Sequence, residues 1–449
     1  MTRSGTENPR GEFVLYWMQS ARRMRSNPAL DYAIREANAR RLPVVAYESI
    51  RPDYPAANDR IHTFVLEGVA ANRRDAEERG IRYEFFLPRT PGDARGVVAG
   101  LASRASLVVT DEYPAFVIRE QTRRFVEKSP VAVHLVDGNG MLPMRIFEKE
   151  QYSARFLRDR AHRLLPEWWP HAADEKAKFH FGGEFGLDSY DGSDPHAAAQ
   201  LCAIDHDVAP VRTRGGRDAA RERLAQFIKR GLNGYAELRN ASLAHTSGLS
   251  PYLHFGHIGI AEVAQAVLES DAEQEDVDSF LEEAIIRREL SFNLCFYRDD
   301  YDSLTALPDW AKRTLDAHRD DRRKRDPHDE VWNLAHRQLL ETGTMHGYLR
   351  MLWGKKLIEW SSTPEKALAA MIGFHDRYAI DGRDPNTYAG VLWCFGKHDR
   401  PWAPERPIFG TIRYMSSAQT AKKVRLKEIE NALCGARVSS PAFPQSRRG

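Results

Sequence analysis

The sequence predicts a protein of two folded parts: an N-terminal doubly wound α/β domain with a parallel sheet, and a C-terminal all-α domain. Short apolar runs alternate with helical patterns over residues 1–165. A stretch rich in Gly, Asp and Pro then covers residues 166–215 and is expected to be a long linker. Helical spacing of apolar residues continues through residues 216–449. A chain of 449 residues is also too long for one ordinary core, which favours two domains.

Five apolar runs in the first part are predicted to be strands buried on both faces: residues 13–18, 42–49, 83–88, 106–112 and 131–138. Residues 28–41 and 61–80 lie between them and show helical spacing, with Gly80 closing the second helix. Doubly wound sheets bind ligands beyond the carboxyl ends of their strands. Neither G-x-G-x-x-G nor G-x-x-x-x-G-K-[ST] follows any of these runs, so the sequence does not indicate a dinucleotide or a nucleoside triphosphate there.

Composition predicts a soluble globular protein, with 42% hydrophobic and 29% charged residues. Apolar runs all fall short of the roughly 20 residues that span a bilayer, and the first residues lack the apolar core of a signal peptide. We therefore expect a cytosolic protein with no membrane partner. The net charge of +2 is too small to indicate a nucleic-acid partner, so such a partner must be argued from local patches.

The cysteine and histidine positions do not predict a metal site. The cysteines stand far apart with no C-x-x-C pair, so free thiols are expected at Cys202, Cys295, Cys394 and Cys434. His254 and His257 could face one side of a helix as metal ligands, but the sequence around them has no matching carboxylate or cysteine cluster. We expect them to be core histidines with satisfied hydrogen bonds.

Three stretches of the helical half contain polar side chains that could bind a ligand. Each also has a simpler structural explanation. Residues 245–258, HTSGLSPYLHFGHI, suit a loop that offers hydroxyl and backbone N–H groups to a phosphate, or an ordinary helix cap. Residues 381–390, DGRDPNTYAG, are dense in turn formers, and their aspartates either cap a helix or bind a ligand's hydroxyls and amides. The basic run at residues 322–325 is a solvated face unless a polyanion binds it.

One predicted helix, GTMHGYLRMLWGKKLIEW at residues 343–360, contains Trp353 and Trp360. Arg350 and Met351 precede Trp353 in the sequence. Seven residues at a rise of roughly 1.5 Å put the two rings about 10 Å apart along the axis and nearly in line, a short distance for an electron. An amphipathic helix with two core tryptophans has the same spacing. Spacing alone therefore leaves packing and electron transfer both open.

Read in order, five segments resemble the photolyase and cryptochrome family: TSGLSPYLHFG, EEAIIRRELSFN, TGTMHGYLRMLWGKKLIEW, DGRDPNTYAGVLWCFGKHDRPW and RYMSS. The closest match is to the class II cyclobutane pyrimidine dimer (CPD) photolyases, over nearly the whole chain. The resemblance implies an N-terminal antenna-type domain and a C-terminal helical domain that binds FAD and DNA. It also implies a monomer and a second, light-harvesting chromophore whose identity the residue types leave open.

The implied activity is that of a carbon–carbon lyase, which repairs CPDs in DNA by light-driven electron transfer from reduced FAD to the flipped-out dimer. A cryptochrome-like flavin photoreceptor that signals without repair is the alternative, and a flavin-free nucleotide-binding protein is a third. The chain ends soon after RYMSS without a long signalling extension, and most lesion-pocket residues are present, so we expect repair. Preference for single- or double-stranded DNA stays open.

The resemblance assigns a set of residues to FAD. Those implied to hold the phosphates are Tyr235, Thr246, Ser247, Gly248, Leu249 and Ser250. Arg350 would pair with Asp381 beside the isoalloxazine ring, where a buried cation favours the anionic reduced flavin, and Asp384 follows in the same stretch. His375 stands where class II enzymes are expected to carry an asparagine near the flavin N5. Histidine titrates near neutral pH, so the flavin's redox behaviour is expected to differ from the family norm.

The same resemblance makes Trp353 and Trp360 part of an electron relay that Trp332 completes from the protein surface. At the lesion, Trp393 would provide a flat apolar wall and Met351 a soft filler. Glu283 is our choice for the acid that hydrogen-bonds the dimer, with Glu282 and Glu289 as rivals on the same predicted helix.

For the DNA backbone and the gap left by base flipping, the resemblance points to the segment KHDRPW. Arg400 and Trp402 match the part of that segment that fills the gap, because a cation and a ring suit a phosphate and an orphaned base. Lys397, Arg413 and the run at 322–325 would add phosphate contacts that do not depend on DNA sequence.

Overall fold

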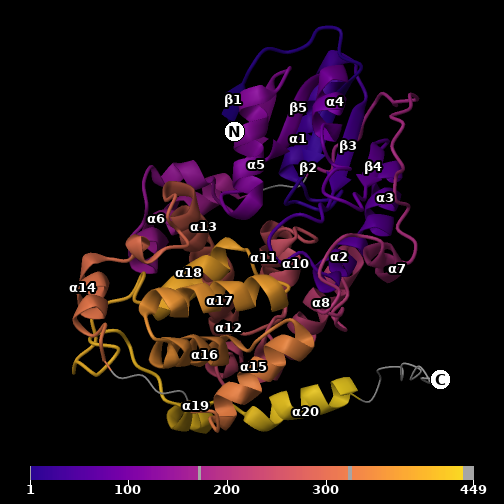
Figure 1. The fold of residues 1–449 in the computed structure, drawn as a ribbon. Helices are drawn as coiled ribbons and strands as arrows, with labels where there is room; N and C mark the ends of the chain where they lie inside the picture. The colour runs from indigo at the N-terminus through magenta and orange to yellow at the C-terminus, as the bar shows by residue number, and fades with distance from the viewer. Residues whose placement is uncertain (1, 170–172, 322–325, 438–449) are drawn as a thin grey trace, which may run out of the picture.

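The computed structural model describes residues 2–169, 173–321 and 326–437, and it confirms the predicted class (Figure 1). An α/β half in indigo and magenta lies above a helical half in orange and yellow. The basic run at residues 322–325 lies outside the described residues.

The sheet of the first half contains all five predicted strands and one more. Its order is β1-β6-β5-β2-β3-β4, and every neighbouring pair is parallel except β1 with β6. The strands are β1 Thr2–Ser4, β2 Phe13–Met18, β3 Val44–Ser49, β4 Arg82–Phe86, β5 Ala105–Asp111 and β6 Val133–Val136. The short edge strand β1 was not predicted. The chain order reverses between β2 and β5, so the switch point where such sheets bind ligands lies there.

Helices cover both faces of this sheet: α1 Pro28–Arg40, α2 Asp59–Leu66, α3 Val69–Glu78, α4 Val97–Arg104 and α5 Phe116–Lys128. The prediction of a single helix over 61–80 is wrong, because the chain forms two helices there, α2 and α3, which are separated at Gly68. A Cβ on Gly68 would lie 3.3 Å from the Cα of Gly216, where the chain enters the helical half. This close backbone approach explains the glycine at the break.

The described residues of the stretch over 166–215 contact the first half at several points. Phe181 and Phe185 pack edge-on against Phe13 of β2, with ring centroids 5.1 and 5.5 Å away. Further on, the chain forms the short helix α7, Pro195–Gln200, and Asp205 makes a β-bridge with Asn58. The helix that leads into this stretch, α6 at Ala154–Trp168, ends past the predicted start of the linker at residue 166 and buries its apolar face in the core of the helical half.

The helical half comprises α8 Arg217–Arg230, α9 Tyr235–Leu238, α10 Ser250–His254, α11 Ile260–Leu268, α12 Gln274–Leu281, α13 Arg288–Tyr297, α14 Asp309–Ala317, α15 Glu330–Thr342, α16 Gly347–Trp360, α17 Pro364–Tyr378, α18 Pro385–Cys394, α19 Ser417–Lys423 and α20 Leu426–Arg437. A π-helical segment, Glu282–Arg287, joins α12 to α13. Within the described residues, no helix combines the length and the apolar character that a membrane crossing requires.

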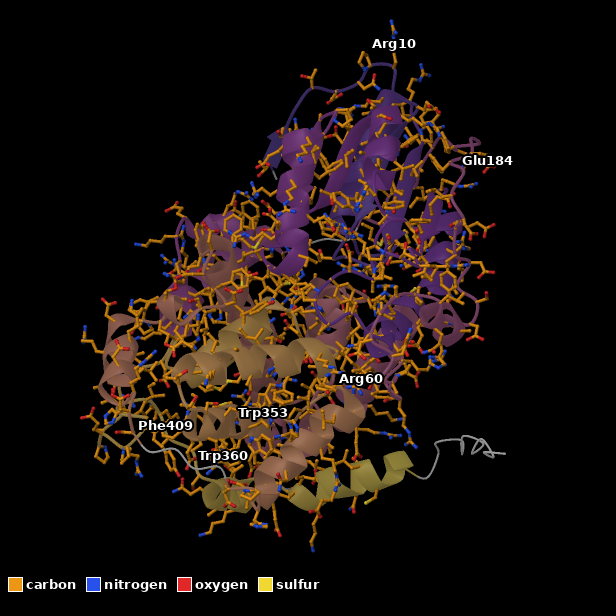
Figure 2. All side chains as sticks on the ribbon, viewed as in Figure 1. Arg10, Arg60, Glu184, Trp353, Trp360 and Phe409 are labelled. Atoms are coloured by element: carbon orange, nitrogen blue, oxygen red, sulfur yellow. The ribbon has the colours of Figure 1, made fainter. Side chains whose placement is uncertain are left out.

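Arg60 of α2 fastens the two halves together (Figure 2). Its buried guanidinium donates hydrogen bonds to the carbonyl oxygens of Tyr378 at 2.6 Å and Leu340 at 2.8 Å. These carbonyls belong to the last turns of α17 and α15, where a cation satisfies groups that the helix itself leaves unpaired. The ends of the two helices that flank α16 are thereby held against the α/β half.

Candidate cofactor and DNA site

Arg350 and Asp381 form the ion pair that the sequence led us to expect. Arg350 Nη2 lies 3.2 and 3.1 Å from the two carboxylate oxygens of Asp381, and the Ser250 hydroxyl donates to the same carboxylate at 2.8 Å. Burial would raise the pKa of Asp381, but the charge of Arg350 and the Ser250 hydrogen bond outweigh it and lower the pKa. The pair therefore stays charged, and it joins α16 to the loop at 246–250.

His375 lies beside this pair on α17. Burial, reinforced by the charge of Arg350, lowers the pKa of His375 to about 4, so its ring is neutral at physiological pH. Nδ1 lies 2.7 Å from the Met371 carbonyl oxygen and must donate to it, which leaves Nε2 as an acceptor. Within the described residues Nε2 has no hydrogen-bond partner, and neither has Nε of Arg350. Buried polar atoms left unpaired mark a place where a polar ligand fits.

The loop at residues 246–250 is held by side-chain contacts to its own backbone. The Thr246 hydroxyl donates to the carbonyl oxygen of Leu243, just before the loop, and the Ser247 hydroxyl accepts from the N–H of Leu249. Leu249 buries its side chain in the core, so it can offer a ligand only its backbone. Gly248 adopts a left-handed φ of +64°, which favours glycine. Ser250, at the end of the loop, faces Asp381.

Arg223 of α8 supports this loop from behind. Its guanidinium donates to the carbonyl oxygens of Ser247 at 2.6 Å and Thr246 at 2.8 Å. A Cβ on Gly248 would lie 2.8 Å from Arg223 Nε, so glycine also gives the guanidinium room. The loop is thereby fixed with a cation next to it, which suits an anionic ligand.

Asp384 belongs to a buried network between the two halves. It accepts hydrogen bonds from His254 at 3.1 Å and from Tyr113, which follows β5, at 3.2 Å, and it caps α18 through the N–H of Asn386. Burial would raise the pKa of Asp384, but the His254 hydrogen bond and the charge of Arg288 lower it to about 2. His254 is thus the satisfied core histidine that we expected.

His257 is buried as well, and its Nδ1 accepts from the N–H of Gly216 at 2.9 Å. Its Nε2 is buried without a hydrogen-bond partner in the described part of the chain, so the expectation of satisfied hydrogen bonds is met at only one of its two ring nitrogens. The described part of the chain contains no group of three or more His, Cys, Asp or Glu side chains that could hold a metal ion. Cys202, Cys295 and Cys394 are buried free thiols, and Cys434 is an exposed one.

Trp353, Trp332 and Trp360 form a row of rings that leads outward from His375. Figure 2 labels Trp353 and Trp360 in the helical half. The His375 and Trp353 centroids lie 5.3 Å apart, Trp353 stacks on Trp332 at 6.5 Å with an interplanar angle of 6°, and Trp332 meets Trp360 edge-on at 5.1 Å. Trp332 was expected to complete the relay from the surface. It is instead the middle ring and is buried, whereas Trp360 is only partly buried.

Of the three glutamates in the π-helical region, Glu283 alone faces Tyr235 of α9. Its carboxylate pairs with Arg239 at 2.7 Å, and the Arg239 guanidinium lies 5.9 Å from the Tyr235 ring centroid. Burial raises the pKa of Tyr235 to about 12, so the phenol keeps its proton and can donate. Arg239, four residues after Tyr235, was not singled out in the sequence. The i, i+4 spacing on one helical face was the available signal.

The two rival glutamates have other partners. The carboxylate of Glu289 is buried and accepts from the backbone N–H groups of Met141 at 2.6 Å and Leu142 at 3.2 Å. Burial raises the pKa of Glu289 to about 7. Glu282 forms an ion pair with Arg158 of α6 at 2.6 Å. Glu289 therefore fastens the chain before α6 to α13, and Glu282 fastens α6 itself to the π-helical segment.

Met351 and Trp393 lie on neighbouring helices whose packing is tight. Both side chains are partly buried, next to Arg350 and at the end of α18 respectively. A Cβ on Gly354 would lie 2.8 Å from the Cys394 sulfur, so α16 and α18 approach closely there. The buried Lys355 donates to the Cys394 carbonyl oxygen at 2.6 Å and fixes the turn that carries Trp393. The sequence analysis did not single out Lys355.

Trp402 lies between two guanidinium groups. Those of Arg400 and Arg413 lie 5.1 and 5.0 Å from its ring centroid, and its indole N–H donates to Asp399 at 3.2 Å. The Arg400 side chain is exposed. Lys397 is a correction: it is buried, pairs with Glu150 at 2.5 Å and donates to a backbone carbonyl, so it is not available to a phosphate.

A cavity of about 530 Å³ opens at the switch point of the sheet. Gln19 and Ser20, just after β2, and Tyr113, after β5, line one side, while Phe255 and Arg383 of the helical half line another. The cavity therefore lies where doubly wound sheets bind ligands, with a wall from each half of the molecule.

Comparisons with known proteins identify the family of this chain. A family model described as DNA photolyase matches residues 14–177. The deoxyribodipyrimidine photo-lyase of Methanothermobacter thermautotrophicus is 36% identical over 442 residues, which cover 95% of each chain. That of Oryza sativa subsp. japonica is 34% identical over 91% of this chain and 85% of its own.

Among solved structures, an archaeal photolyase from Sulfolobus tokodaii aligns over 93% of this chain and 89% of its own, with a TM-score of 0.65 at 15% identity. That likeness concerns the fold. The identity to the photo-lyases extends over nearly the full length of both chains, and the chain therefore belongs to the DNA photolyase family.

Proposed function

We propose that this protein is a deoxyribodipyrimidine photo-lyase that uses light to split cyclobutane pyrimidine dimers in DNA, with FAD as its catalytic cofactor. The observation that carries the proposal is the pair of the partly buried Arg350 with the buried Asp381, with the unpaired His375 nitrogen beside it, at the inner end of the tryptophan row. A polar ring that accepts electrons suits this place. FAD, when bound and reduced, supplies the excited electron that the dimer receives.

The chain's own residues would hold FAD at both ends. Arg350, kept charged and oriented by Asp381, provides a fixed cation beside the ring system and favours its anionic reduced form. Nε2 of the neutral His375 would be the acceptor that this chain offers to the ring system. Asp384, through Tyr113 and His254, fixes the start of α18 next to the pair. Tyr235 and the loop at residues 246–250 are proposed to hold the phosphates.

The dimer would bind where Glu283, Met351 and Trp393 face the ring system. Trp393 provides a flat apolar surface for the flipped bases, and Met351 fills the space beside it. Glu283 would hydrogen-bond the dimer and stabilise its radical anion while the ring opens, since Arg239 holds this carboxylate in place. Arg400, Trp402 and Arg413 would occupy the gap in the duplex and contact its phosphates.

The tryptophan row and the cavity at the switch point would each contribute to the light-driven steps. Electrons would move inward from Trp360 through Trp332 to Trp353 and keep the cofactor reduced. The cavity at the sheet's switch point would hold a second, light-harvesting chromophore. The related archaeal photolyase is described as holding two FAD molecules, one of them implicated in light harvesting.

We propose residues 1–165 as the antenna-type domain, 166–215 as the linker and 216–449 as the FAD- and DNA-binding domain. The enzyme would act in the cytoplasm as a monomer on DNA that contains UV-induced dimers.

The deciding experiment is illumination of the reduced protein with dimer-containing DNA, with a matched dark sample. Loss of dimers in the light alone is the expected result. A yellow, FAD-containing protein that binds no damaged DNA and leaves dimers intact in the light would instead indicate the signalling photoreceptor. A colourless protein would exclude both functions.

A further inference from the structure

His336 of α15 lies inside the row of tryptophans. Its ring stacks on Trp332 with centroids 4.7 Å apart and an interplanar angle of 16°, and it lies 6.3 Å from Trp353 at 11°. Phe374 of α17 meets it edge-on at 5.0 Å. The Trp353 indole N–H donates to His336 Nδ1 at 3.2 Å.

This hydrogen bond fixes the proton positions on His336. Because Nδ1 accepts from the indole, the proton of the neutral imidazole is on Nε2. Trp332 differs, because its indole N–H donates to the backbone carbonyl of Trp353 at 3.2 Å. An amide oxygen is a far weaker base than an imidazole nitrogen. Of these two stacked tryptophans, Trp353 is the one whose N–H faces a base.

We propose that His336 is the proton acceptor of Trp353 during light-driven reduction of the cofactor. The inference rests on the proposed relay. One electron leaves Trp353 for the photoexcited oxidised flavin, and the indole N–H becomes far more acidic than in the neutral ring. The Nε1–H bond breaks, the proton moves to Nδ1, and the products are a neutral tryptophanyl radical and an imidazolium. When Trp332 reduces the Trp353 radical by one electron, the proton returns to Nε1 of Trp353 and His336 is again neutral.

The surroundings of Trp353 explain why a proton acceptor is needed. Its side chain is fully buried, and it also contacts His375, which lies next to the charged Arg350. A positive charge left on a buried ring near a second cation is costly. Moving the proton to the partly buried His336 transfers that charge away from the cofactor side and disfavours the electron's return.

A purely structural hydrogen bond is the competing explanation, since a buried indole N–H usually has a partner. Two variants separate the explanations. His336→Asn places an amide oxygen near the position of Nδ1, so it can accept the hydrogen bond but cannot take the proton. His336→Phe keeps a stacked ring and removes the acceptor. Phe374→Leu is the control, because it loosens the packing around the same pair and leaves the base.

The measurement is flash absorption of the FAD-containing protein in H₂O and in D₂O. The tryptophan radical cation and the neutral radical differ in visible spectrum, and a proton transfer coupled to electron transfer is slower in D₂O. In the wild type and in Phe374→Leu we expect the neutral radical and an isotope effect on its formation. In both His336 variants we expect the radical cation, loss of the isotope effect and a smaller yield of reduced cofactor.

NMR of the Trp353 indole N–H in the dark protein gives a readout that is independent of light. The shift of this signal should persist in His336→Asn and change in His336→Phe. An unchanged isotope effect and neutral radical in His336→Asn would show that His336 is not the acceptor, and so would a wild type that forms only the radical cation. A wild type that forms no tryptophan radical at all would overturn the relay itself, and this inference with it.

Discussion

Glu283 differs from the neighbouring glutamates Glu282 and Glu289 in the surroundings of its carboxylate. Its ion pair with Arg239 is about one-third exposed, whereas Glu289 is fully enclosed by backbone donors. An acid that must bind a substrate needs a free lone pair and access to solvent. Glu283 has both, because Arg239 occupies one side of a partly exposed carboxylate.

We expect Glu283→Gln to lower the yield of dimers split per absorbed photon. A hydrogen bond to a charged group contributes about 1.5–3 kcal/mol, so the ring-opening step that it stabilises should slow by about tenfold or more. FAD content and affinity for damaged DNA should change much less. Glu282→Gln is the matched control, since its partner is Arg158 on the side of α6. An equal loss in Glu282→Gln would assign the effect to helix packing instead.

There is a physical reason why the sequence does not show which of these glutamates is the acid that contacts the dimer. In a regular α-helix Glu282 and Glu289, seven residues apart, share one face, and Glu283 is about 100° away. The actual backbone is π-helical over Glu282–Arg287, which changes the rotation between these positions. The partners that decide each role, such as the N–H of Met141, are far away in sequence.

The helices α15 and α16 form the relay together. Sequence spacing correctly placed Trp353 and Trp360 on one helix, but it could not show that Trp332 of α15 lies between their rings. That arrangement depends on how two helices cross, which is set by packing at their interface. The i, i+4 spacing of Trp332 and His336 was readable, but its meaning depends on Trp353.

Trp353→Phe keeps an apolar ring of similar shape, so the protein should fold and bind FAD nearly as before. The phenyl ring is much harder to oxidise. Oxidised cofactor in the variant should therefore resist photoreduction by blue light with an external reductant, while chemically reduced protein should still split dimers. Trp332→Phe and Trp360→Phe should likewise impair photoreduction while leaving dimer splitting by the chemically reduced protein intact. Normal flash-induced radical formation in Trp353→Phe would mean that the tryptophans serve packing alone.

The segment after α18 presents Trp402 between Arg400 and Arg413. If Arg400 enters the gap made by base flipping, Arg400→Ala should weaken binding to a dimer-containing duplex more than to an undamaged one. A simple phosphate contact would weaken both equally and reduce the salt dependence. Fluorescence anisotropy on the two duplexes at several salt concentrations measures this. Arg406→Ala is the control, because Arg406 lies over Tyr414 in the same segment.

At the scale of the whole molecule, composition and periodicity predicted the fold class, five of the six strands of the sheet and the helical character of the second half. They did not predict how the halves dock. Docking depends on single polar contacts between distant residues, such as Arg60 with the ends of α15 and α17 and Tyr113 with Asp384. No periodic pattern marks such residues, because each is surrounded in sequence by residues with unrelated partners.

The Asp384 network gives this docking a pH dependence. The ordinary pKa of 3.8 falls to about 2 in the folded protein, so the ionised carboxylate stabilises the fold. A lowered acid pKa contributes stability that is fully present above the ordinary value and is lost as pH falls through the folded value. From this difference we expect about 2 kcal/mol at neutral pH, about half of it gone by pH 3.

Asp384→Asn should remove that contribution while keeping the cap of α18, since asparagine caps helices well. Urea unfolding followed by circular dichroism should show the variant less stable than the wild type at pH 7, with the difference shrinking between pH 4 and pH 2. Asp309→Asn, at an exposed aspartate that pairs with Lys312, should show little change. A deficit in Asp384→Asn that stayed constant down to pH 3 would mean that shape and hydrogen-bond geometry, rather than the charge facing His254 and Arg288, hold the two halves together at this point.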